Sequence, residues 1–177
     1  MQFFKPVYGW VFAVLMLALV SESKAGNGFY NRSRGRKYEW SAGLRIGNPF
    51  AATLKHFVNP MVAWEFNAGY YRYNDKGNWK QVSAALQYHV PVTTNRLLHW
   101  YGGGGLSAMY WYYAPDWGAG IFPQTTTGAF FQTGLDYSMK RWPLNVAVDW
   151  TPYFQFSGVD RGLGLSYGAL SIRYIIR

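Results

Sequence analysis

The sequence predicts an all-β protein, an eight-stranded antiparallel transmembrane β-barrel arranged as an up-and-down meander. Three observations carry this prediction. Aromatic residues make up 20% of the 177 residues, whereas charged residues make up 14%. No long uninterrupted apolar run follows residue 25, and apolar and polar residues alternate through much of the remaining chain. Transmembrane barrels have this signature because their strands turn alternate side chains toward lipid and lumen.

The stretch 143–156, "PLNVAVDWTPYFQF", shows the alternation most clearly. Its apolar residues, such as Val148 and Trp150, share one parity, and Asp149 lies on the other. Successive side chains of a strand point to opposite faces, so one face is apolar and the other carries a charge. An Arg or Lys that faces hydrocarbon at the bilayer midplane costs about 2–4 kcal/mol. We therefore expect the charged parity to face the lumen.

Eight segments are expected to be strands: 38–47, 51–57, 61–73, 79–90, 98–112, 127–139, 143–156 and 163–176. The connections at 58–60, 91–97 and 140–142 fall at one end of such a meander and are compact. The opposite end holds the loops 74–78, 113–126 and 157–162, together with a short turn at 48–50. Short periplasmic turns and longer outward loops are typical of bacterial outer-membrane barrels.

The first 25 residues are predicted to be a signal peptide. Lys5 precedes the apolar stretch "YGWVFAVLMLALV", and "SKA" at residues 23–25 fits the small-x-small cleavage rule. The apolar run is shorter than the ~20 residues that a spanning helix needs. Residues 26–37 would then form a basic N-terminal tail and residues 38–177 an outer-membrane β-barrel domain. The expected location is the cell outer membrane, with outer-membrane lipid as a partner.

The basic tail contains Arg32, Arg34, Arg36 and Lys37, within a chain of net charge +9. A solvated tail is the favoured interpretation, because a secreted chain rarely meets nucleic acid. No nucleic-acid partner is therefore expected. Attraction to anionic lipid headgroups is a further alternative.

Residue parity divides the strands into two sets. The charged set predicts a lumenal ionic network: Glu39, Arg45, Lys55, Glu65, Asp136, Asp149 and Arg173. The apolar set predicts a lipid-facing surface with an aromatic girdle: Trp40, Trp64, Tyr70, Tyr88, Trp100, Tyr110, Trp150 and Tyr174. Tyr38 shares the parity of Trp40 and is expected to face lipid, and Trp111 is also assigned to the girdle. A barrel of eight strands has an interior just wide enough for side chains to fill.

Several motifs also resemble a known family. They are "GLRIGNPFAATLKHFVN", "LHWYGGGG", "GLDYSM" followed by "PLNVAVDWTPYF", and "GALSIRYII". Over roughly residues 38–177 they resemble the small outer-membrane β-barrel proteins common in Bacteroidota. Arg45, Lys55, Asp149 and Arg173 match recurrent charged positions of that family. The resemblance implies an integral outer-membrane barrel, mostly without an assigned activity.

The C-terminus departs from the usual pattern of such barrels. They commonly end in an aromatic residue that the barrel-insertion machinery recognises, whereas this chain ends "RYIIR". Tyr174 keeps the lipid-facing parity. The insertion machinery therefore stays an expected partner, with a weakened recognition signal.

No motif predicts catalysis, a metal site or a cofactor. The chain has no cysteine, and His56, His89 and His99 lack metal-ligand spacing. The "GGGG" at 102–105 lacks the Lys-Ser/Thr of a phosphate-binding loop, and glycines in a strand permit close backbone approach instead. No Ser-His-acid arrangement meets the requirements of a hydrolase. The chain is therefore predicted not to be an enzyme.

The leading functional prediction is a structural or interaction barrel with a polar, side-chain-filled lumen. The loop 113–126 carries Trp117, Ile121 and Phe122, which suit a surface contact with a ligand. The alternatives are a narrow pore or conduit for small solutes, an interfacial lipid-modifying enzyme, and a soluble lipocalin-like binding protein. The last would place the apolar parity inside the barrel and the charges outside.

Overall fold

The computed structural model describes residues 38–73, 77–94, 96–113, 125–158, 161–165 and 167–176. The predicted signal peptide and basic tail therefore lie outside the described residues, as does 114–124 of the loop predicted to contact a ligand. Every regular element in the described part is a β-strand. No helix long and apolar enough to cross a membrane occurs among these residues.

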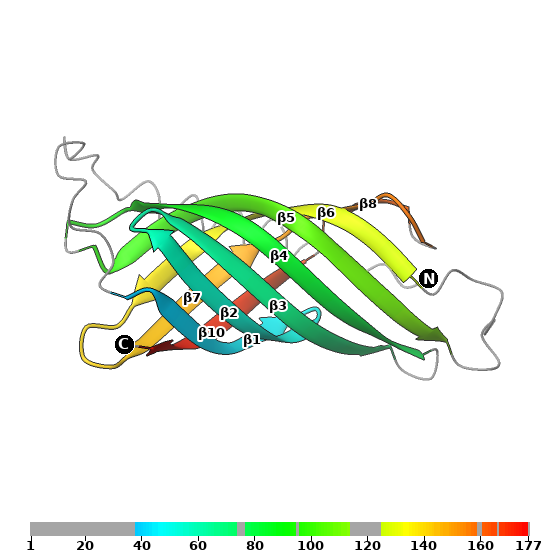
Figure 1. Ribbon diagram of the computed structural model, residues 1–177, viewed down its shortest axis with the longest axis horizontal. Coiled ribbons are helices and arrows are strands. Elements are labelled where there is room, and N and C mark those ends of the chain that lie inside the picture. Colours follow the sequence, from blue (N-terminus) through cyan, green and yellow to red (C-terminus); the bar gives the residue numbers. More distant parts are fainter. Residues whose placement is uncertain are drawn as a thin grey trace. The chain divides into compact units, whose positions relative to one another are not determined.

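The described strands form ten segments, which make up eight barrel strands (Figure 1). Thr151 and Pro152 separate β7 from β8, and residues 165–167 separate β9 from β10. Proline has no backbone N–H to donate to a ladder, which accounts for the first interruption. The segments are β1 (Trp40–Gly47), β2 (Phe50–Asn59), β3 (Val62–Tyr73), β4 (Gly77–Pro91), β5 (Leu98–Tyr113), β6 (Thr125–Ser138), β7 (Leu144–Trp150), β8 (Tyr153–Gln155), β9 (Gly162–Gly164) and β10 (Gly168–Ile176).

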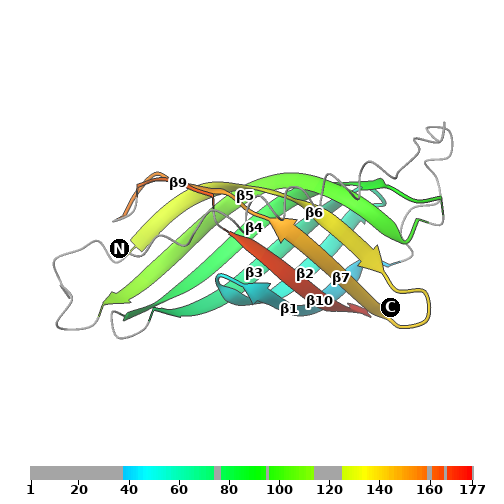
Figure 2. The same cartoon turned by 180° about the vertical axis from the view of Figure 1, so that it is seen from behind.

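All pairings are antiparallel, and they close the sheet on itself. The neighbours run from β1 through β6 in chain order, then to β7, to β10 and back to β1. Past the C-terminal end of β7, the β8–β9 hairpin continues the sheet, with β8 paired to β6. Figures 1 and 2 show the tilted strands of this closed barrel from its two sides. The predicted fold class is therefore confirmed.

The strands define two ends of the barrel. β2, β4 and β6 end near Trp40 and Ile176, at what we call the short-turn end. β1, β3, β5 and β8 end at the opposite end, which we call the long-loop end after the loops that the sequence predicts there.

The alternation of side chains is regular along the strands. In β6 and β7 nearly every second residue is buried, and the residues between them are exposed or half-buried. Outward residues include Leu106 and Val82, which are 65% and 60% exposed, whereas Lys55, Glu65 and Asp149 point inward and are fully buried. The charged parity thus faces the lumen. The opposite arrangement, expected for a lipocalin-like barrel, is not the one that this chain adopts.

Glycine allows β4 and β5 to approach closely. A Cβ atom added at Gly103 would clash with the carbonyl oxygen of Leu86, and one at Gly105 would clash with that of Ala84. A side chain at either position would force the two strands to shift. The role predicted for the glycine run, close backbone approach within the barrel wall, agrees with this geometry.

Two predicted orientations at the start of β1 are wrong. Tyr38 was expected to face lipid but is 8% exposed and packs edge-to-face on Phe57, with 5.4 Å between ring centroids. Glu39 was expected in the lumen but is exposed. The ladder begins only at Trp40, and Glu39 lies in a bend where its carbonyl accepts a hydrogen bond from Phe57 N at 2.8 Å. Strand parity therefore does not extend back to these two residues.

Candidate functional site: the filled lumen

Glu65 of β3 is the centre of an ion-pair cluster inside the barrel. Its carboxylate lies 3.1 Å from Lys55 Nζ of β2 and 3.0 Å from Arg173 Nη2 of β10. Arg45 of β1 approaches it at 3.7 Å, and the Gln87 amide of β4 donates a hydrogen bond to it at 2.8 Å. One buried carboxylate therefore joins its own strand, β3, to four others.

Asp149 of β7 forms a bidentate ion pair across the lumen. Both of its oxygens accept hydrogen bonds from the Arg45 guanidinium, at 2.5 and 2.6 Å. Tyr101 Oη and Thr151 Oγ1 also donate to it, at 3.0 and 2.9 Å. A bidentate pair of this kind fixes orientation as well as distance. It also connects β1 with β7, which are not neighbours in the sheet.

Asp136 of β6 completes the cluster. It lies 3.4 Å from Lys55 Nζ and accepts a hydrogen bond from the Asn145 amide at 2.5 Å. Asn145 in turn accepts one from Arg173 Nη1 at 3.3 Å. Lys55 also lies over the ring of Tyr101, 4.7 Å from its centroid.

The lumenal cluster is electrically balanced. Of the seven residues predicted for it, the structure brings six together and leaves Glu39 outside. The six are three carboxylates and three cations, each at most 8% exposed: Arg45, Lys55, Glu65, Asp136, Asp149 and Arg173. Charges taken out of water need partners and hydrogen bonds to offset the loss of hydration. We call these six residues the ionic layer.

A second set of side chains fills the lumen at the long-loop end. Trp79 and Tyr71 have ring centroids 5.6 Å apart, and Phe130 and Tyr153 have centroids 5.1 Å apart. We call this set the aromatic layer. It consists of buried Trp79, Ala85, Met109, Phe130 and Tyr153, with Tyr71, Trp111 and Tyr167 packed against them.

The aromatic layer was not predicted, and one of its members was placed wrongly. Trp111 was assigned to the girdle, but its ring packs on Trp79 with 5.5 Å between centroids, and its Nε1 donates to Thr126 at 3.1 Å. Parity alone would have predicted the inward orientation, since Trp79 shares a face with Gln81 and Trp111 shares one with Met109. Trp111 was assigned outward because bulky aromatic side chains were expected to face lipid.

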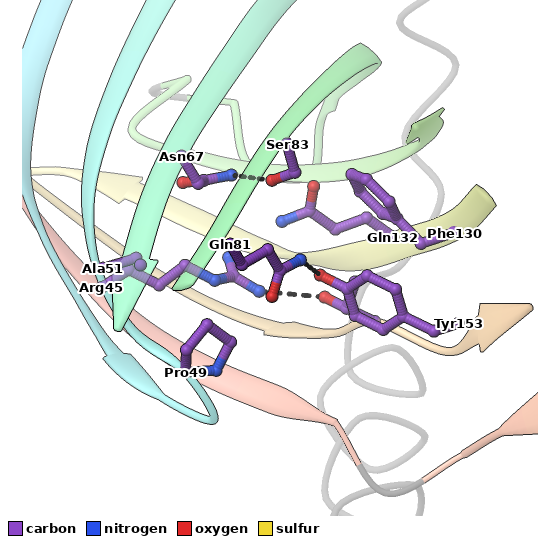
Figure 3. Close-up of a pocket in the computed structure, with 11 residues that line it drawn as sticks. Arg45, Pro49, Ala51, Asn67, Gln81, Ser83, Phe130, Gln132 and Tyr153 are labelled. Carbon is purple, nitrogen blue, oxygen red and sulfur yellow. Dashed lines mark hydrogen bonds between the residues drawn. The ribbon is translucent and has the colours of Figure 1, made fainter. Parts of the chain in front are cut away.

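A small polar cavity lies between the two layers (Figure 3). The room for the centre of a water molecule is ≈ 10 Å³, which is roughly what a single water requires. Gln81 and Tyr153 both line the cavity, and Gln81 Nε2 donates a hydrogen bond to Tyr153 Oη at 2.9 Å. The cavity is lined by Arg45, Pro49, Ala51, Asn67, Gly69, Gln81, Ser83, Phe130, Gln132, Thr151 and Tyr153.

The three histidines do not converge. His56 lies outside the lumen, stacked on Trp40 with 4.1 Å between ring centroids. His89 and His99 are buried near the short-turn end, with 6.5 Å between their ring centroids, and His89 stacks on Tyr101. In the described part of the chain, no three His, Asp or Glu side chains are grouped in a way that could hold a metal ion.

The eight residues predicted for the girdle all lie on the outer surface. Their exposed fractions run from 37% for Trp150 to 59% for Tyr174. Large aliphatic side chains are exposed on the same surface, among them Leu44, Val82 and Leu86. The outer surface of the barrel is thus apolar and aromatic.

These features define a class of protein: a closed eight-stranded antiparallel barrel with a charged, filled interior and an apolar exterior. Among solved structures, the chain resembles the N-terminal β-barrel domain of OprF from Pseudomonas aeruginosa. The TM-score is 0.50 and the sequence identity 17%, over 77% of this chain and 95% of that domain. Similarity at this level of identity shows a shared fold.

No protein-family model matches the chain, and no curated protein matches it either. The resemblance to small Bacteroidota barrels therefore stays a prediction.

Proposed function

We propose that this chain is an integral outer-membrane barrel with a structural or interaction role, and that its lumen does not conduct. The observation that carries the proposal is the distribution of side chains. Trp, Tyr, Phe, Leu and Val cover the outside, whereas an ionic cluster of zero net charge fills the inside. In water this arrangement would expose a large apolar surface, whereas in a bilayer that surface contacts hydrocarbon and the charges stay inside the barrel, away from lipid.

The length of the apolar surface supports the proposal. On β3 the outward residues Val62, Trp64, Phe66, Ala68 and Tyr70 follow one another without a charge. At about 3.4 Å per residue and a tilt near 40°, they span roughly 20 Å along the bilayer normal, close to the ~25 Å apolar band of outer-membrane barrels. We place the long-loop end toward the cell exterior and the short-turn end toward the periplasm.

Electrophoresis of the membrane-fraction protein tests the location. We expect faster migration before boiling than after it, because a folded membrane barrel withstands the detergent and stays compact. A protein recovered in the periplasm without any heat-dependent shift would contradict the proposal.

The packing of the lumen supports a closed barrel over a narrow pore. An ion that enters must displace Glu65 and its three cationic partners, which are buried and hydrogen-bonded. Separating these charges would leave them buried and unpaired, which is strongly unfavourable. In planar bilayers we expect no defined current steps. Steps that change with Asp149→Asn or Arg173→Gln would favour the pore instead.

We further propose that the barrel is not an enzyme. Two of the three histidines, His89 and His99, are buried and point into the lumen, where a bilayer lipid does not reach. Expression of the protein should leave the lipid A and phospholipid profiles of the host unchanged. A new lipid species that disappears with His89→Gln would establish the lipid-modifying alternative.

A further inference from the structure

The outer face of β3, β4 and β5 carries an ordered group of polar side chains at the long-loop end. Strand register places Arg72 opposite Asn78, and Asn78 opposite Tyr112. The next row toward the barrel centre holds Tyr70, Lys80 and Tyr110, again directly opposite one another. We call these six residues the donor patch. All but the half-buried Asn78 are exposed.

The chemistry of the donor patch suits a phosphate group. Residues directly opposite in an antiparallel pair have Cβ atoms about 4.5–5.5 Å apart, and successive rows on one face lie about 7 Å apart. A guanidinium can grip phosphate through two hydrogen bonds, and an ammonium adds a compact positive charge. Lys80 Nζ lies over the Tyr112 ring, 5.2 Å from its centroid, which keeps the ammonium within the patch.

The charge distribution of the outer surface favours an anionic partner. The ionic layer is neutral, but the outside of the described barrel carries Arg72, Lys80, Arg96, Lys140, Arg141 and Arg161. The one outward carboxylate among the described residues is Glu39, at the short-turn end. The donor patch thus has two cations and, within the described chain, no carboxylate beside them.

The surface next to the donor patch, toward the barrel centre, is apolar. The next outward row consists of Ala68, Val82 and Ala108, and the row after it has Ala84 between Phe66 and Leu106. Three of these side chains are single methyl groups, and none of them is charged. We call Ala68, Val82, Ala84 and Ala108 the alanine track. It leads from the donor patch toward the middle of the apolar surface.

We propose that this face binds an anionic phospholipid, whose headgroup phosphate carries no neutralising cation, with that phosphate on the donor patch and an acyl chain along the alanine track. The proposal rests on the membrane location proposed above and adds the partner and its site. A lipid fits better than a free phosphate, because a soluble anion would leave the track unused. Basic residues at a membrane surface attract anionic headgroups in general, and the ordered rows make this attraction local.

The test uses the full chain refolded into nanodiscs of phosphatidylcholine with a minor fraction of phosphatidylglycerol. Native mass spectrometry then counts the lipids that each protein retains. The wild type should retain phosphatidylglycerol in preference to phosphatidylcholine. In the double variant Arg72→Gln/Lys80→Gln, the retention of phosphatidylglycerol should fall at least about tenfold. The matched control Lys140→Gln/Arg141→Gln removes two exposed cations at the opposite end and should retain it as the wild type does.

A second variant tests the contact with the acyl chain separately from the contact with the phosphate. Ala108→Phe fills the alanine track without changing the charge, and it should reduce phosphatidylglycerol retention severalfold. Added inorganic phosphate should not displace the lipid.

Several results would overturn the proposal. They are equal losses in the two double variants, full retention in Arg72→Gln/Lys80→Gln or in Ala108→Phe, no wild-type preference, or complete displacement by inorganic phosphate. A chain that fails to insert and shows no heat-dependent mobility shift would instead refute the membrane location. An inserted, heat-modifiable barrel without lipid preference would refute this inference alone.

Discussion

The two layers of the lumen fill the same barrel by different means. The ionic layer consists of six charged side chains whose polar atoms meet partners at 2.5–3.7 Å. The aromatic layer consists mainly of rings, with centroids of contacting rings 5.0–5.6 Å apart, and it has few hydrogen bonds. Hydrogen-bonded charges tolerate little displacement, whereas apolar contacts are not directional.

The difference indicates that the layers have different tasks. Arg45 and Asp149 hold each other across the lumen from strands that are not neighbours, so that one arrangement of the barrel satisfies them. Trp79, Met109 and Phe130 instead occupy volume at the long-loop end. We therefore expect the ionic layer to be intolerant of lost partners and the aromatic layer to be sensitive to lost or added volume.

The largest effect is expected for Glu65→Ala. Without this carboxylate, Arg173 and Lys55 keep their charge in a buried site and lose their shortest ion pairs. The free energy of unfolding should fall by about 3–5 kcal/mol. Denaturant titration of the refolded barrel, followed by electrophoretic mobility, measures the change.

Glu39→Ala is the matched control, because Glu39 is an exposed carboxylate outside the ionic layer. Its effect should stay within about 0.5 kcal/mol. Similar losses for the two variants would show that burial in the ionic layer does not matter.

The next effect concerns the fit of the aromatic layer to the wall. A Cβ atom at Gly105 would lie 2.8 Å from Cζ of the Phe130 ring, in addition to its clash with the Ala84 carbonyl. Gly105→Ala should therefore cost about 1–3 kcal/mol through overpacking. The stability of the refolded barrel in urea is the measurement.

Gly104→Ala, one residue away, serves as the control for Gly105→Ala. Gly104 faces outward, and the nearest atom to its added Cβ is the Phe130 carbonyl oxygen at 3.2 Å. The added methyl group should change stability little. Equal losses of stability for the two variants would mean that the packing inside the barrel does not limit the size of the side chain at position 105.

Much of the fold and part of the ionic layer could be predicted from the sequence. Alternation is a local property, so it assigned Lys55, Glu65 and Asp149 to one face without knowledge of the closed barrel. The pairing of Lys55 with Glu65 also follows locally, because they are directly opposite in the β2–β3 hairpin. The pairing of Arg45 with Asp149 does not, since it depends on how the barrel closes.

The remaining features depended on more than parity. To place Tyr38 and Glu39 correctly, one must know where the β1 ladder begins. Phe57 N bonds to the Glu39 carbonyl there, and the regular strand starts one residue later. Trp111 and Trp79 lie on the inward parity, but only the closed barrel shows that its long-loop end has room for their rings. The donor patch depended on the register of three strands, because Tyr110 and Tyr112 lie far in the sequence from Arg72 and Lys80.

A smaller effect is expected when the aromatic layer changes shape but keeps its volume. Met109 is 3% exposed and belongs to this layer. Met109→Leu should cost less than about 1.5 kcal/mol, since volume-conserving apolar substitutions are well tolerated. Lys55→Met, of similar length but in the ionic layer, should cost more, because it leaves Asp136 and Glu65 with fewer partners. Equal losses in urea titrations would remove the distinction between the layers.

The smallest effect is expected where the aromatic layer makes one of its hydrogen bonds. Tyr153 Oη accepts a hydrogen bond from Gln81 Nε2 at 2.9 Å, beside the polar cavity. Tyr153→Phe keeps the ring contacts with Phe130 and Tyr167 and removes this acceptor, so the loss should be about 1 kcal/mol. Tyr137→Phe, on the exposed outer surface, is the control and should be near neutral. A loss at Tyr153 as large as that of Glu65→Ala would mean that the aromatic layer, too, is held by its polar contacts, and the contrast between the layers would disappear.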